Sequence, residues 1–103
     1  MNCIAVVTTI GSIDEAQSLA RALVERKLAA CAQISEIESF YTWNEAVQND
    51  KEYRVLFKTV NERYKEVENA IRNLHSYELP AIHAIAFEHV YAPYGEWIEA
   101  NAG

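Results

Sequence analysis

A long pair of predicted strands most constrains how this chain of 103 residues can fold. Residues 28–59 begin at the end of a helix, continue as an apolar and aromatic segment to Trp43, and return from Tyr53 with alternating apolar and polar residues. The polar residues 44–50 between the two strands are typical of a turn. A hairpin of this length is hard to cover in so small a chain, so we expect its outer part to protrude and to contact a partner.

Hydrophobic periodicity predicts the elements that precede this hairpin. Residues 3–10 are almost continuously apolar and β-branched, which is typical of a strand buried on both faces. Ser12 and Glu15 have the spacing of a capping box. The apolar residues that follow keep helical spacing to about Lys27, so we expect the first helix there.

The second half of the chain repeats this order of a helix and then a strand. Residues 59–62 have the spacing of a second capping box, and an apolar stripe over residues 64–74 predicts a second helix. Residues 82–91 are typical of another strand, and Pro93 is suited to the first turn of a short final helix. We also expect a bulge or break near residues 35–36, because the parity of the apolar positions changes there.

The predicted element order defines a fold class. Two right-handed crossovers through strand, helix, strand, strand, helix and strand give an antiparallel-dominated sheet with both helices on one face. The prediction is therefore an α+β fold, a ferredoxin-like βαββαβ sandwich with an extended hairpin between its second and third strands and a short C-terminal helix. The length predicts one domain over residues 1–103. The sheet face away from the helices still carries apolar side chains, and oligomerisation is the simplest way to cover it.

Composition and charge argue against several classes of function. The net charge of -6 and the pI of about 5.0 do not suit nucleic-acid binding, which depends on clustered Lys and Arg. The N-terminal residues lack the basic leader and apolar core of a signal peptide, and no segment is long enough to span a membrane, so we expect a cytoplasmic protein. Cys3 and Cys31 lack the spacing of a disulfide framework or a zinc knuckle, and we expect reduced, buried thiols.

Residues spread along nearly all of the chain resemble the divalent-cation tolerance proteins, the CutA family. The matching positions are Leu28, Ala29, Ala30, Cys31, Ser39, Tyr41, Trp43, Glu52, Lys58, Thr59, His75, Tyr77, Glu78, Pro80, Tyr94 and Trp97. The resemblance implies a ferredoxin-like fold and a tight homotrimer in which hairpins and sheet edges pair between subunits, similar to PII-type signalling proteins. It also implies a link to tolerance of copper and other divalent cations, and it brings no reaction.

The chain departs from the family pattern at positions that bear on metal binding. Some members of the family carry a cysteine at the end of the first strand and a pair of histidines before a Pro-Tyr, which are plausible copper ligands. Here Thr8 stands at the cysteine position and Leu74 at the first histidine position, which argues against a soft-ligand copper site of that kind. Ser76 replaces the usual proline, and Asn44-Glu45-Ala46 replaces the usual Glu-Gly-Lys turn.

His75 and Glu78 are the candidate metal ligands, because imidazole and carboxylate suit copper, zinc and nickel. They follow a helix end, where a turn can bring them together, and a neighbour in a trimer could add Glu52 or Glu45. The alternative is that His75 bonds the last carbonyls of the helix, while Tyr77 and Glu78 orient the loop. No cofactor is expected to be obligatory, and a divalent cation such as Cu or Zn is the expected ligand.

A second candidate site is a cleft between subunits, lined by Lys58, Tyr77 and Glu52. Lys58 could meet an anion there, and the alternative is an ion pair of Lys58 with Glu52 or with a helix carboxylate. His83 and His89 lie too far apart on their strand to share a site, so each is expected at the surface or at an interface.

The hairpin aromatics Phe40, Tyr41 and Trp43 are expected at the trimer interface, because aromatic residues favour interface cores. Stacking of these rings on a ligand is the alternative.

Two functions remain open. One is a non-enzymatic homotrimer that binds divalent cations, copper in particular, and contributes to metal tolerance. The other is a PII-like regulatory or scaffolding trimer that binds a small anionic ligand or a protein partner in clefts between subunits. An enzyme is not expected, because the sequence has no Gly-rich phosphate loop, nucleophile elbow or convincing nucleophile-base pair.

Overall fold

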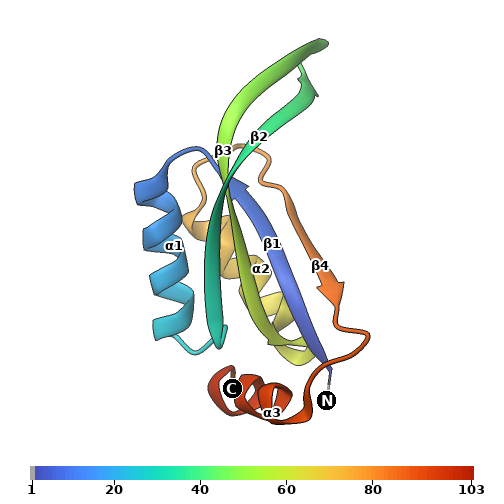
Figure 1. The fold of residues 1–103 in the computed structure, drawn as a ribbon. Helices are drawn as coiled ribbons and strands as arrows, with labels where there is room; N and C mark the ends of the chain where they lie inside the picture. Colours follow the sequence, from blue (N-terminus) through green and yellow to red (C-terminus); the bar gives the residue numbers. More distant parts are fainter. Residues whose placement is uncertain (1) are drawn as a thin grey trace.

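The fold is an antiparallel sheet with helices packed against it, shown by a computed structural model of the protein that describes residues 2–103 (Figure 1). In chain order the elements are β1 (Cys3–Ile10), α1 (Ile13–Glu25), β2 (Cys31–Trp43), β3 (Ala46–Val60), the 3-10 helix η1 (Asn61–Arg63), α2 (Tyr64–Leu74), β4 (Ile82–Ala86) and α3 (Ala92–Asn101). The strand order is β2-β3-β1-β4, and each neighbouring pair is antiparallel. The predicted ferredoxin-like α+β fold is therefore confirmed.

The main core lies between one face of this sheet and helices α1 and α2. Its buried members are Ile4, Val6, Ile10, Ala16, Leu19, Leu23, Ala29, Val55, Phe57, Val67, Ala70 and Ile71. Each large apolar side chain buried in this way contributes about 1.5–3 kcal/mol. A smaller cluster of Cys3, Ala30, Ile98 and Ala102 lies where α3 crosses the end of the sheet at which β1 begins (Figure 1).

The hairpin is more regular than its sequence suggests. Strands β2 and β3 stay paired in one register from Cys31 opposite Lys58 to Trp43 opposite Ala46, so the expected bulge near residues 35–36 was wrong. Residues 46–50 belong to β3, and the turn consists of Asn44 and Glu45 alone, with φ angles of 51° and 64°. Two central residues with positive φ match the twist of a two-residue hairpin turn. Beyond Ile34 the hairpin leaves the core. This explains why the apolar residues of β2 change there from even-numbered positions, such as Ile34, to odd-numbered ones, such as Ile37.

The two predicted capping boxes differ in outcome. The backbone N–H of Glu15 donates to Ser12 Oγ at 3.1 Å, which confirms the first. The second was wrong, because neither η1 nor α2 has a side-chain cap, and the Thr59 hydroxyl donates instead to the Leu28 carbonyl at 2.7 Å. Thr59 is buried in β3, so its position in the sheet, and not its spacing to Glu62, determines its hydrogen-bond partner.

Three predicted boundaries also changed. Helix α1 ends at Glu25, two residues before the expected end, and Lys27 has a φ of 59°. Strand β4 ends at Ala86, so residues 87–91 do not continue it. Leu74, expected on the inner stripe of α2, is 44% exposed. These residues lie at element ends, where packing decides more than periodicity does.

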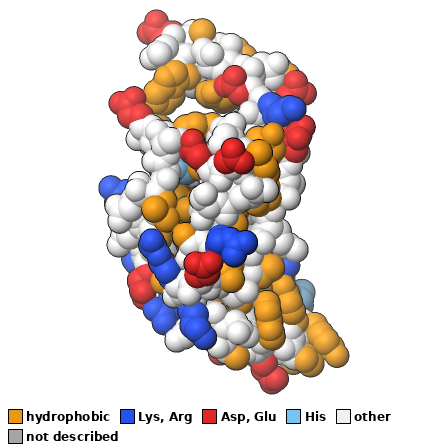
Figure 2. All heavy atoms as spheres, turned by 90° about the vertical axis from the view of Figure 1, so that its left-hand side faces the viewer, with side chains coloured by type: hydrophobic (Ala, Val, Ile, Leu, Met, Phe, Trp, Pro, Cys, Tyr) orange, Lys and Arg blue, Asp and Glu red, His pale blue; other side chains and the backbone are white. Residues whose placement is uncertain are grey.

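The outer half of the hairpin extends beyond the rest of the molecule (Figure 1). The whole molecule, hairpin included, measures 45 × 26 × 22 Å along its principal axes. Phe40 and Val47 are 68% and 75% exposed there, and Tyr41 and Trp43 are also exposed. Figure 2 shows hydrophobic side chains among acidic ones at this end, and a further hydrophobic group at the α3 end. Across residues 2–103, each helix is too short or too polar to cross a membrane.

Candidate functional site

The centre of the candidate site is Glu52, a carboxylate that is only 6% exposed. Its strand partner is Ile37, on the sheet face opposite α1 and α2. The Tyr77 hydroxyl donates to Glu52 Oε2 at 2.8 Å. Within the described part of the chain no Lys, Arg or His forms an ion pair with Glu52. A buried charge without a counter-ion is costly to the fold, so its position calls for an explanation.

His75 holds the loop that brings Tyr77 to Glu52. Its Nε2 lies 2.7 Å from the Thr9 carbonyl oxygen. A carbonyl only accepts, so Nε2 carries the proton, and Nδ1 is then the acceptor for the Tyr77 backbone N–H at 3.1 Å. The rings of His75 and Tyr77 also contact each other, with centroids 4.7 Å apart. Both ring nitrogens of His75 are therefore engaged within the subunit. Its backbone N–H donates to the Ile71 carbonyl at 2.9 Å, so His75 caps the last turn of α2, as the alternative interpretation of this residue expected.

Gly11 leaves room for this arrangement. A Cβ atom at position 11 would lie 3.0 Å from the Tyr77 hydroxyl oxygen, so a larger residue would press the hydroxyl away from Glu52. The same loop is joined to α1 by Ser76, whose hydroxyl donates to Glu15 Oε2 at 2.7 Å. The end of β1, the start of α1 and the hairpin base therefore hold the loop together.

The surroundings of Tyr77 keep its hydroxyl protonated. Burial raises the pKa of Tyr77 strongly, and the hydrogen bond to Glu52 and the Glu52 charge raise this pKa further. A neutral phenol at neutral pH is a permanent donor, which suits its bond to the Glu52 carboxylate oxygen.

A cavity of about 770 Å³ opens between the hairpin and this loop. Its lining residues are Thr9, Ile37, Ser39, Phe40, Tyr41, Thr42, Trp43, Glu52, Arg54, Ser76, Tyr77, Glu78, Leu79 and Ala81. The Tyr41 hydroxyl donates to Asp50 on the facing strand, and this bond raises the pKa of Tyr41. The cavity therefore combines aromatic walls with one buried carboxylate, a combination that suits ligand binding.

Lys58 lies away from this cavity. It is six residues further along β3 than Glu52, about 20 Å on an extended strand. Its ammonium donates to the Tyr94 hydroxyl at 3.1 Å and stands 5.2 Å from the Tyr94 ring centroid, while Tyr94 stacks on Trp97. The structure thus brings Glu52 and Tyr77 together within one subunit, but separates Lys58 from both. The alternative ion pair between Lys58 and Glu52 is not formed.

The metal candidates are less convergent within one subunit. Residues 2–103 contain no group of three or more His, Cys, Asp or Glu side chains placed to hold a metal ion. Glu78 is exposed at the cavity, and His83 and His89 are exposed as expected. Cys31 is half-buried and Cys3 is buried; burial raises the pKa of the Cys3 thiol, and the Glu99 charge adds to this. The Cys3 thiol is therefore a poor nucleophile and a poor ligand.

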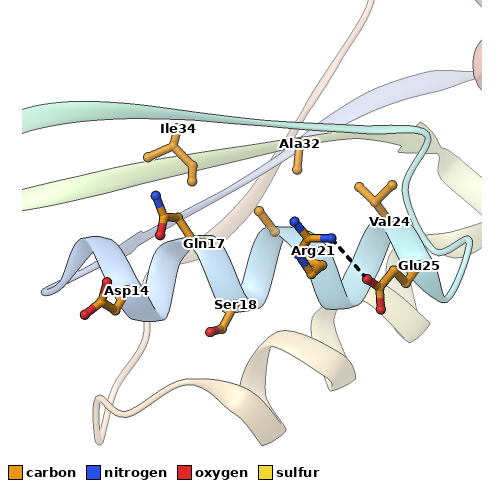
Figure 3. Close-up of a pocket in the computed structure, with 9 residues that line it drawn as sticks. Asp14, Gln17, Ser18, Arg21, Val24, Glu25, Ala32 and Ile34 are labelled. Atoms are coloured by element: carbon orange, nitrogen blue, oxygen red, sulfur yellow. Dashed lines mark hydrogen bonds and ion pairs between the residues drawn. The ribbon is translucent and has the colours of Figure 1, made fainter.

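A second hollow runs between α1 and the outer edge of β2 (Figure 3). Its volume is about 800 Å³, and its side chains include Gln17, Val24 and Ile34, with Arg21 and Glu25 paired at 3.5 Å on the rim. It contains no buried ionisable side chain among its lining residues. Because β2 is an edge strand, this hollow lies along a sheet edge that no other strand of the described chain pairs.

Comparison with known proteins decides the family. The chain matches the model of the CutA1 divalent ion tolerance protein family over residues 4–101. The protein belongs to the CutA1 family. It is 38% identical over 98 residues to the divalent-cation tolerance protein CutA of Thermotoga maritima, covering 95% of this chain and 97% of that protein.

Solved CutA structures share the fold closely. The structure of the periplasmic divalent cation tolerance protein CutA from Archaeoglobus fulgidus has a TM-score of 0.95 at 33% identity, with all of both chains covered. The divalent cation tolerance protein from Thermus thermophilus has a TM-score of 0.93 at 33% identity, again over both whole chains. The resemblance to the CutA family and the ferredoxin-like fold that it implied are confirmed.

Sequence reasoning missed several members of the site. It did not identify the Thr9 carbonyl, Gly11 or Arg54. Gly11 directly follows a predicted buried strand, which is a signal for a close approach. The other two gave no signal, because a backbone acceptor and a long flexible side chain become part of a site only through folding.

Proposed function

We propose that this CutA family member is a homotrimeric, non-enzymatic divalent-cation tolerance protein. Support comes from the protruding hairpin, whose Phe40, Tyr41, Trp43 and Val47 are all exposed. Exposed apolar clusters of this kind are uncommon on soluble monomers, and aromatic residues favour interface cores. The unpaired edge of β2 adds backbone groups that a neighbouring subunit can pair.

Divalent-cation binding, with Cu(II) foremost, uses ligands from more than one subunit in this proposal. A single copy offers fewer than three convergent ligands in its described residues, whereas copper and zinc sites use several nitrogen, oxygen or sulfur donors. Glu78, on the exposed loop beside the cavity, is a ligand candidate, and His75 joins it only if the bond to Thr9 opens. A symmetric trimer contains each carboxylate three times, which supplies the additional ligands that a single subunit lacks.

The test has two measurements on metal-free protein. Light scattering gives the mass, and a Cu(II) titration against a competing chelator gives the stoichiometry. The proposal predicts a trimer that saturates near one ion per subunit or one per trimer, and a variant that no longer assembles should lose this binding. A monomer at micromolar concentration, or copper uptake no greater than that of an unrelated acidic protein, would contradict it.

The cavity beside Glu52 favours a second candidate, a PII-like regulatory trimer that binds a small ligand in a cleft. In that case the effect on metal tolerance is indirect. Saturable binding of a metal-free organic ligand, with no copper binding, would distinguish this candidate from the first.

We also infer residence in the cytoplasm. The supporting observation is that Cys3 and Cys31 are both free thiols, as is usual in a reducing compartment. The related Archaeoglobus fulgidus protein is described as periplasmic, so fractionation of cells followed by immunoblotting is the direct test. Recovery in the periplasmic fraction would contradict this inference.

A further inference from the structure

We infer that the cavity beside Glu52 binds an organic cation with an apolar body, such as a substituted ammonium. The inference rests on the second candidate function and names the class of ligand for its cleft. It differs from the small anion that the sequence suggested, because the structure places Lys58 away from the cavity and Glu52 inside it.

The charge of the cavity comes first. Glu52 is a cavity-lining carboxylate that is more than nine-tenths buried. One of its oxygens accepts from Tyr77, and the ion pairs of residues 2–103 include none that neutralises it. Attraction between charges is strongest where water is excluded, so a cation that enters the cavity gains more from Glu52 than from a surface carboxylate.

The walls of the cavity are apolar and aromatic. Tyr41 and Trp43 come from the hairpin, and Tyr77 and Leu79 come from the loop between α2 and β4. Aromatic rings attract organic cations through the negative charge on their faces, and Leu79 adds an apolar surface for the rest of the ligand. A volume of about 770 Å³ lies in the range of small-molecule sites.

The rings are held in place before a ligand arrives. The Tyr77 hydroxyl bonds to Glu52 and the Tyr41 hydroxyl bonds to Asp50. Because these side chains are already ordered, binding does not have to immobilise them.

The same residues do not suit a metal ion or an anion. Metal ions need several donor atoms, and residues 2–103 place no three such side chains together here. An anion would meet the buried Glu52 charge. Arg54 also lines the cavity, but it is exposed, so solvent and salt weaken its effect on a ligand.

The experiment is calorimetry on the assembled protein in the presence of a chelator, with benzylamine and benzyltrimethylammonium as probes. Benzyl alcohol has the shape of benzylamine without the charge, and benzoate has the opposite charge. We expect saturable binding of both cations, with benzyl alcohol and benzoate weaker by about tenfold or more. Quenching or a spectral shift of tryptophan fluorescence provides a second readout, because Trp43 lines the cavity.

Two variants locate the binding. Glu52→Gln keeps an acceptor for Tyr77 but removes the charge, and it should weaken benzylamine binding by about tenfold or more. Glu36→Gln is the matched control, because Glu36 is an exposed carboxylate of β2 on the other sheet face, and it should leave the affinity unchanged. Should Glu52→Gln not fold, the comparison of benzylamine with benzyl alcohol on the unmodified protein decides alone.

The outcomes separate this inference from the proposed trimer. Equal affinity for benzylamine and benzyl alcohol, no binding of either cation, or an unchanged affinity in a folded Glu52→Gln variant would overturn the inference. A trimer that takes up copper but no ammonium would overturn it while leaving the first proposed function intact. Ammonium binding by a protein that scatters as a monomer would support the ligand class named here but contradict both proposed trimers.

Discussion

The hydroxyl of Tyr77 donates a 2.8 Å hydrogen bond to Oε2 of Glu52, and it does so across 25 residues of sequence. The bond joins the loop after α2 to the base of the hairpin, and His75 fixes the loop from the other side through Thr9. Because Glu52 is buried without an ion-pair partner in the described chain, this bond is the main polar support of its charge.

The Tyr77→Phe variant should therefore be less stable. It leaves the buried Glu52 without its donor, and the free energy of unfolding should fall by about 2 kcal/mol, as for other hydrogen bonds to charged groups. Urea denaturation followed by circular dichroism measures this change. Tyr91→Phe is the control, because Tyr91 is 77% exposed; equal effects in the two variants would argue against the role of the bond.

The contribution of Tyr77 should also depend on pH. Burial, with the bond to Glu52, raises the pKa of Tyr77 above its ordinary value of 10.0. A group whose pKa is higher in the folded state stabilises the fold fully below its unfolded pKa and loses this contribution as the pH rises through the folded value. The stability difference between the unmodified protein and Tyr77→Phe should thus shrink from about pH 9 to about pH 11. Paired denaturation curves test this, and a difference that grows over the range would reverse the sign.

Thr8→Val should make the protein more stable. The Thr8 hydroxyl is fully buried and makes no hydrogen bond, and replacing it with a methyl group of similar size should raise the free energy of unfolding by about 1 kcal/mol. Thr59→Val is the matched opposite, because its buried hydroxyl donates to Leu28. Thermal unfolding should shift upward for the first and downward for the second, and shifts of the same sign would contradict the assignment.

The hairpin turn offers a second stabilising change. Glu45 has a φ of 64°, a region that glycine adopts without steric cost, and an Asn-Gly pair is preferred in such turns. Glu45→Gly should therefore raise the free energy of unfolding by about 0.5–1 kcal/mol. Ala46→Gly, one residue along in β3, should lower it, and denaturation midpoints compare the two. A loss of stability on Glu45→Gly would show that the Glu45 side chain makes a contact outweighing the strain.

Trp43→Ala should weaken the proposed trimer. The exposed indole lies next to the hairpin turn, where a neighbouring hairpin can cover it. Light scattering over decreasing protein concentration should show dissociation at a higher concentration than for the unmodified protein. Thr42→Ala, on the other face of the same strand, should have little effect. An unchanged mass for Trp43→Ala at low concentration would contradict a role of this side chain in assembly.

Most of the fold could be predicted because it depends on local spacing. Strand β1 has the predicted bounds, and the capping residue Ser12 of α1 was identified from neighbours three residues away. The hairpin was predicted in outline, but the extent of β3 was not, because Gln48, Asn49 and Asp50 are polar and are held by pairing with β2.

The candidate site, too, was predicted only in those features that depend on the local sequence. The sequence by itself determined which residue types were present, and it placed Glu52 and Tyr77 in one candidate set. Only the tertiary structure decided that these two meet, that Lys58 bonds Tyr94 instead, and that both nitrogens of His75 are occupied. Hydrogen bonds and burial between distant segments depend on how helices and strands pack, and local periodicity carries no record of that packing.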